Sequence, residues 1–147
     1  KGEESYLKNL VGNHLYPLYL FVNQPVGPAA IHRFFNKLGK DVTDVLLLTL
    51  ADLTATYIAG ERAHDLARYR SFTGDLLNKY YFEAQTYVNL PDLVKGEDLM
   101  AALGLTPSRK VGELLRKISE AQVRGEITSK EEALSYAAAL LAKEEDH

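Results

Sequence analysis

Cysteine is absent from this chain of 147 residues, so the candidates for holding a metal ion or transferring a proton that stand out are histidines and aspartates. Asp52 lies in the apolar run 42–58, where helical spacing groups it with Val45 and Leu48 and predicts apolar surroundings for its carboxylate. An unpaired charge in such surroundings is unfavourable, and His14 and His32 are candidate partners for it. Asp52 is therefore either a metal ligand or general base, or a carboxylate satisfied by a structural hydrogen bond.

His64 and Asp65 form an adjacent pair that could also suggest a metal site. Neighbouring residues on a helix point about 100° apart, so these two cannot face one ion without ligands from elsewhere. The charged residues nearby, including Arg68 and Arg70, favour a solvated helix face instead.

A third candidate is a set of basic residues that surrounds the start of a helix. The first turn of that helix contains two cations and would present unpaired N–H groups, which together could bind a phosphate. The alternative is a solvated face balanced by nearby glutamates such as Glu113 and Glu120. The candidate RNA-binding residues are Lys95, Ser108, Arg109, Lys110, Arg116 and Lys117.

The elements that must position these residues are helices, and the pattern predicts an all-α bundle of about seven helices with a small carboxyl-terminal helical subdomain. No segment alternates for long enough to indicate a strand. The predicted helices include residues 3–11, a short helix or extended segment over 15–22, and 28–38, 42–59, 61–88, 95–103, 107–124 and a final helix that starts near residue 128. The helix over 42–59 is apolar on nearly every face, which predicts the central helix of the first half.

Local signals set the expected ends of the later helices. Thr106 is expected to cap a helix that has Pro107 in its first turn, and Thr128 with Glu131 is expected to form a capping box. Gly74 is expected to bend the long helix. A mid-helix glycine at Gly112 is expected to let the preceding helix approach closely.

Composition limits the classes of function. The net charge of −3 and pI near 5.8 argue against a wholly basic nucleic-acid binder, although a local basic face can act on an acidic chain. The run 42–58 is interrupted by polar residues, and the first residues lack a signal-peptide pattern, so no membrane association is expected. The absence of cysteine is compatible with a cytoplasmic location, which is the expected one.

The segment 96–134, GEDLMAALGLTPSRKVGELLRKISEAQVRGEITSKEEAL, resembles the carboxyl-terminal region of bacterial CCA-adding enzymes and related poly(A)-polymerase-like nucleotidyltransferases. That family has G-x-D-L, L-G-L-x-P-G, V-G-x-L-L, A-Q-x-x-G-x-I and T-x-x-E-A-L in the same order, and here Ser108 follows the proline in place of glycine. The resemblance implies a helical region that engages tRNA.

The segment 31–55, IHRFFNKLGKDVTDVLLLTLADLTA, is similar to the end of a metal-dependent phosphohydrolase domain of the His-Asp type. In that family a late aspartate joins upstream histidines at a metal, which implies a metal role for Asp52 and, on weaker resemblance, for His14. The implied division is 1–89 as the end of the His-Asp-type domain and 93–147 as the RNA-engaging tail, joined at Asn89-Leu90-Pro91-Asp92.

The paired carboxylates of a nucleotidyltransferase head are not found in this sequence, so the chain is expected to be inactive in nucleotide addition by itself. Its expected partners are tRNA and a missing amino-terminal catalytic domain, with a homo-oligomer left open. No cofactor is expected in this chain, whereas the full-length protein could use a divalent metal. A metal-dependent phosphohydrolase fragment and a helical oligomerisation module are the alternative functions.

Overall fold

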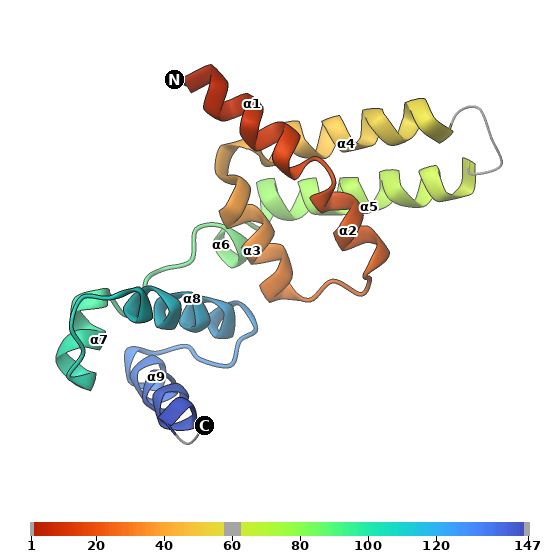
Figure 1. The fold of residues 1–147 in the computed structure, drawn as a ribbon. Coiled ribbons are helices and arrows are strands. Elements are labelled where there is room, and N and C mark those ends of the chain that lie inside the picture. Colours follow the sequence, from red (N-terminus) through yellow and green to blue (C-terminus); the bar gives the residue numbers. More distant parts are fainter. Residues whose placement is uncertain (1, 58–62, 146–147) are drawn as a thin grey trace. The chain divides into compact units, whose positions relative to one another are not determined.

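The structure is a computed structural model that describes residues 2–57 and 63–145 and contains helices but no strand within those ranges (Figure 1). The all-α prediction is confirmed. The described residues form nine α-helices and one 3₁₀ turn, where about seven helices were expected. They are α1 (Gly2–Asn13), α2 (Tyr16–Val22), α3 (Pro28–Leu38), η1 (Gly39–Asp41), α4 (Val42–Tyr57), α5 (Ala63–Phe82), α6 (Ala84–Tyr87), α7 (Gly96–Leu103), α8 (Arg109–Val123) and α9 (Lys130–Glu145). The expected helix end at Ala59 and start at Glu61 lie outside the described residues.

The chain divides into two compact units, Lys1–Val88 and Asn89–His147, each with its own apolar core. The first unit packs α3 and the start of α4 around fully buried phenylalanines at Phe34 and Phe35. Pro28 opens α3 because its missing N–H needs no partner there, and Gly39 ends it with a positive φ of 55°. No helix among the described residues is long and apolar enough to cross a membrane.

The long helix expected over 61–88 is interrupted near its end. It stops at Phe82, Glu83 leaves the helical conformation, and α6 adds one further turn. The helix α5 runs through Gly74 without a break. Carbonyl groups of Glu83 and Ala84 accept from Thr86 and Val88, so the chain forms a separate turn after Phe82.

The helix α4 packs against α1, α2, α3 and α5, as expected of the central helix of the first half, but its outer face is exposed. Its inner face is buried at Val45, Leu46 and Thr49, whereas Leu47 and Leu48 are 50% and 39% exposed. Ala51 and Ala55 are exposed on the same side. A helix that is apolar on every face gives no periodicity from which to choose the inward side, so packing made that choice.

The second unit consists of α7, α8 and α9 around one core. That core contains Leu99 from α7, Leu114 and Ile118 from α8, and Ala133 and Ala137 from α9, all between 0% and 3% exposed. Gly104 and Gly125 end α7 and α8 with φ values of 64° and 73°. The N–H groups of the residues that follow each glycine, Leu105 and Glu126, bond back into the preceding helix, which closes both C-termini.

Two of the expected helix starts are displaced. The N-cap of α8 is Ser108, not Thr106, so Pro107 precedes the helix instead of occupying its first turn. The capping box of α9 is formed by Ser129 and Glu132. The Ser129 hydroxyl accepts from the Glu132 N–H at 3.2 Å, and the Glu132 carboxylate accepts from the Ser129 N–H at 3.2 Å and the Thr128 N–H at 2.6 Å.

The first prediction compares adjacent leucines on α4. Leu46→Ala should lower the free energy of unfolding by about 2–5 kcal/mol, because Leu46 is fully buried and its loss leaves a cavity. Leu47→Ala should change it by less than about 0.5 kcal/mol. Chemical denaturation of both variants measures this, and equal losses would contradict the assignment of the outer face.

The second prediction concerns the cap of α9. Hydrogen bonds from Thr128 and Ser129 lower the pKa of Glu132 from its usual 4.5. A lowered folded-state pKa stabilises the fold above the unfolded pKa, and this contribution is lost as the pH falls through the folded value. Glu132→Gln should therefore be less stable than the wild type at pH 7, and the difference should vanish in acid. Glu131→Gln is the matched control, since a similar loss there would restore the box expected from the sequence.

Candidate nucleic-acid interface

The predicted basic residues of α8 lie on the side of the helix that faces away from the core. The buried stripe runs through Val111, Leu114, Ile118 and Ala121. Arg109 and Arg116 are exposed on the opposite side, and Lys110 and Lys117 lie half-buried on its flank, seven residues apart and therefore on one line along the helix. The structure thus brings these four predicted residues to one helix.

Arg109 and Arg116, the arginine row of α8, are each paired with a glutamate one turn further on. Arg109 Nε lies 3.1 Å from Glu113 Oε1, and the Arg109 side chain is 93% exposed. Arg116 Nη1 lies 2.5 Å from Glu120 Oε1, and the Glu120 side chain is only 11% exposed. Arg116 therefore stabilises a mostly buried carboxylate as well as contributing charge to the surface, whereas Arg109 contributes mainly charge.

The N-terminus of α8 differs from those of the other helices in residues 89–145. The starts of α7 and α9 are closed by the carboxylates of Asp98 and Glu132. Ser108 makes no side-chain cap bond, and the first turn of α8 has no acidic residue. The first N–H groups of α8 and the adjacent Arg109 and Lys110 therefore form the electropositive end of this unit.

Lys95 is exposed and precedes α7, but its backbone N–H is already used. It donates to Asp98 Oδ2 at 2.8 Å, while Lys130 from α9 bonds the other carboxylate oxygen. The bond from Lys130, followed by the bond from Lys95, holds the pKa of Asp98 below its usual value. Only the side chain of Lys95 is therefore available to a ligand.

A hollow of about 230 Å³ lies between α8 and the segment that leads into α7. Sequence reasoning missed it, because no motif marks a cavity between a loop and a helix. Gly96 makes the close approach here, since a Cβ on it would lie 3.5 Å from Val111. The role expected for Gly112 is wrong, because nothing lies within 4 Å of the position that its Cβ would take. The hollow is lined by Asp92, Leu93, Val94, Lys95, Gly96, Leu115, Ile118, Ser119 and Gln122.

The structure places the two predicted metal ligands, His14 and Asp52, on neighbouring segments of the first unit. Asp52 is exposed, so the expectation of apolar surroundings is wrong; it shares the outer side of α4 with Leu48 and Ala55. The Thr49 hydroxyl donates to the His14 carbonyl, which places His14 beside the turn of α4 that precedes Asp52. No group of at least three His, Asp or Glu side chains suited to a metal occurs within residues 2–57 and 63–145. The His14–Asp52 site stays a prediction that requires further ligands.

The other histidines do not add to that site. His32 is buried, and its Nδ1 donates to the Tyr87 carbonyl at 2.8 Å while its Nε2 accepts from the Asn36 amide at 2.9 Å. Both ring nitrogens are thus occupied, as expected of a core histidine. His64 and Asp65 are exposed on α5, in agreement with a solvated face.

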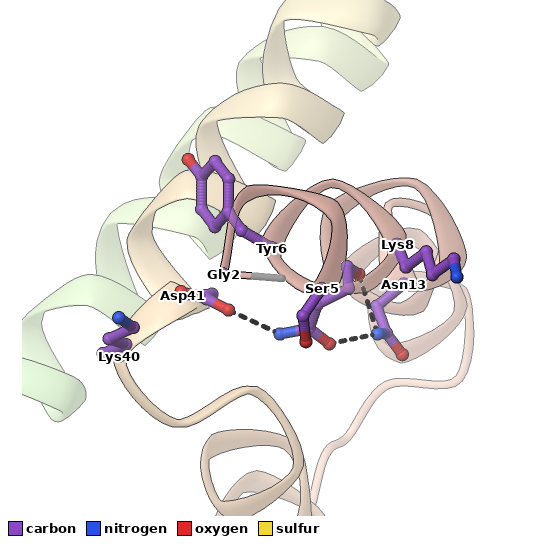
Figure 2. A pocket seen from close by; sticks show the side chains of 8 residues that line it. Gly2, Ser5, Tyr6, Lys8, Asn13, Lys40 and Asp41 are labelled. Atoms are coloured by element: carbon purple, nitrogen blue, oxygen red, sulfur yellow. Dashed lines mark hydrogen bonds between the residues drawn. The ribbon is translucent and has the colours of Figure 1, made fainter.

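A larger hollow of about 560 Å³ lies beside α1 and the turn before α4 (Figure 2). Tyr6, Lys40 and Asp41 are on its wall, and the Asn9 amide donates to Asp41 at 2.7 Å. The Tyr6 hydroxyl donates to Asp44 at 2.9 Å, and this bond raises the pKa of Tyr6. These bonds attach α1 to the start of α4, so the polar groups have a structural role.

Comparison with known proteins identifies the class. Residues 58–138 match the family described as tRNA nucleotidyltransferase domain 2, and the chain belongs to this family.

Three curated relatives agree with this assignment. The chain is 33% identical over 115 residues to the A-adding tRNA nucleotidyltransferase of Deinococcus radiodurans, covering 78% of this chain and 26% of that protein. It is 32% identical over 107 residues to the CC-adding tRNA nucleotidyltransferase of Synechocystis sp., covering 73% and 23%. The CC-adding enzyme of Thermus thermophilus is 32% identical over 108 residues, covering 73% and 22%. The chain thus spans about a quarter of these relatives, and no solved structure matches it.

Proposed function

We propose that this chain is a helical RNA-binding region of a tRNA nucleotidyltransferase and that α8 contacts the phosphates of tRNA. The observation that carries the proposal is the start of α8, which has no acidic residue and no side-chain cap but has Arg109 and Lys110 in its first turn. The positive potential of a helix N-terminus and two cations in the first turn favour an anion at this point. Arg116 and Lys117 extend the contact along the helix.

The ion pairs of the row do not oppose this role. An exposed pair such as Arg109 with Glu113 is worth about 0–1 kcal/mol, whereas a hydrogen bond to a charged group contributes about 1.5–3 kcal/mol. A phosphate can therefore replace Glu113 as the partner of Arg109. Arg116 would have to leave the mostly buried Glu120, so we expect it to contribute less to binding than Arg109.

In this proposal the transfer chemistry belongs to another part of the enzyme. The named activities of the relatives are A addition and CC addition to tRNA, and this chain spans about a quarter of their length. The chain itself would hold the RNA and not add nucleotides. The absence of cysteine fits a reducing compartment, and we place the protein in the cytoplasm.

The exposed apolar face of the first unit supports a second contact, with the catalytic part of the same enzyme. Leu47 and Leu48 of α4 are accompanied by Leu7 and Val11 of α1, which are 58% and 66% exposed. Large apolar side chains exposed on two helices that contact each other favour an interface. Its polar neighbours include Asp44 and Asp52, so a second copy would bring like charges together, whereas a partner with a basic rim would not.

The third prediction tests RNA contact. Binding of tRNA to the chain, measured by fluorescence anisotropy, should weaken as salt rises, because bound phosphates release counterions. Arg109→Ala should weaken binding and reduce the magnitude of the salt slope by about 1.

Arg70→Ala, an exposed arginine of α5, is the matched control and should leave the slope unchanged. Thermal unfolding of each variant separates a binding defect from a loss of fold. Binding that does not depend on salt, or no binding by the folded wild type, would contradict the proposal.

The fourth prediction tests the apolar face. Leu47→Glu should leave unfolding of the 147-residue chain nearly unchanged, because Leu47 is half exposed. In a polypeptide that also contains the nucleotidyltransferase part, the same change should lower the melting temperature.

The matched control is Glu4→Gln on α1, because Glu4 is exposed and the change keeps the apolar face. Leu141→Glu is unsuitable, because Leu141 packs on the second core. Sedimentation of the chain alone tests the alternative, in which the apolar face binds a second copy of the chain. A dimer that Leu47→Glu abolishes would assign the face to a second copy and overturn the proposed contact.

A further inference from the structure

The hollow beside α8 combines an apolar floor with a polar rim. Val94 and Ile118 on its floor are 5% and 3% exposed. Asp92, Lys95, Ser119 and Gln122 supply polar groups to its lining. At about 230 Å³ it is smaller than the pockets of about 300–1,000 Å³ that enclose drug-sized ligands, which suits a single planar ring.

The polar groups in this lining include more hydrogen-bond acceptors than donors, although the Lys95 ammonium is a donor. Gln122 Nε2 donates to the Pro91 carbonyl at 3.0 Å, which leaves the amide carbonyl to accept from a ligand. Asp92 presents a carboxylate, and the Ser119 hydroxyl can donate or accept. A ligand edge that carries N–H donors is therefore favoured over an edge of carbonyl groups.

The hollow opens next to the arginine row of α8. Successive residues turn by about 100° around a helix. Gly112 and Ser119 therefore lie on one line along α8, between the line of Arg109 and Arg116 and the other positions of α8 that line the hollow. Neighbouring rows are about 5–6 Å apart. Arg116 precedes Ser119 by three residues and is therefore its neighbour on the helix surface, whereas Arg109 lies about 15 Å further along the axis at about 1.5 Å per residue. Gly112 is exposed, with open space where a side chain would project.

We propose that the hollow binds one unstacked nucleobase that carries an exocyclic amino group, from a strand whose phosphates lie along α8. This inference rests on the proposed RNA contact and adds base recognition to it. Unpaired bases in RNA are recognised by insertion into such pockets and by hydrogen bonds to their edges. Adenine, cytosine and guanine offer an amino donor to Asp92 and Gln122, whereas uracil has no amino group and carries its one N–H donor between two carbonyl groups.

The fifth prediction uses oligoadenylate, oligocytidylate, oligouridylate and an abasic oligomer, all of equal length and charge. The chain should bind the first two more tightly than the last two by about fivefold or more, the effect of one hydrogen bond. Ser119→Leu, which fills the hollow, should remove this preference and leave binding of the abasic oligomer unchanged. Fluorescence anisotropy at low salt measures all four.

Ser135→Leu, at an exposed position of α9, is the matched control and should keep the preference for amino-bearing bases. If Ser119→Leu unfolds the chain, Asp92→Asn at an exposed position tests the same site and should also reduce the preference for amino-bearing bases. Equal binding of all four oligomers, or a preference that survives in the folded Ser119→Leu and Asp92→Asn variants, overturns the inference. The RNA contact itself then stands if Arg109→Ala still weakens binding, whereas failure of every oligomer and of tRNA to bind overturns both.

Discussion

Burial of one stripe of α8 is the constraint on which the second unit depends. Leu114, Ile118 and Ala121 must face α7 and α9, because they supply most of the apolar surface that joins the three helices. This orientation leaves the opposite side of α8, with its arginines, to the solvent. The same rotation places Ser119 and Gln122 beside the loop before α7. The charged row and the hollow are therefore two consequences of one packing choice.

Helix capping then decides where the positive potential remains. Asp98 and Glu132 neutralise the starts of α7 and α9, and Lys130 connects these two starts through its bond to Asp98. Because α8 begins at Ser108 without a carboxylate, the positive potential of its N-terminus remains next to Arg109. An acidic chain can thus present a local anion site, since phosphate responds to nearby charge more than to net charge.

In the first unit, packing buries one side of α4 and leaves the apolar residues of its other side exposed. Its core is formed by the inner side of α4 with α3 and α5, and its outer side keeps leucines such as Leu47 in contact with solvent. The contact proposed for this exposed face is with the part of the enzyme outside the aligned segment, which is about a quarter of the relatives' length. Asp52, grouped from its spacing with buried residues, belongs to this outer side instead.

The sequence by itself determined the all-α class, most helix positions and the glycine stops, because 3.6-residue periodicity and left-handed glycines act locally. It also marked the family through the motif over 96–134. Tertiary structure decided which side of α4 faces inward, since an apolar run has no preferred side. It also selected Ser108 and Ser129 over Thr106 and Thr128 as N-cap residues, because neighbouring serine and threonine residues are all suited to that position. The hollow beside α8 exists only in three dimensions, where a loop and a helix distant in sequence meet.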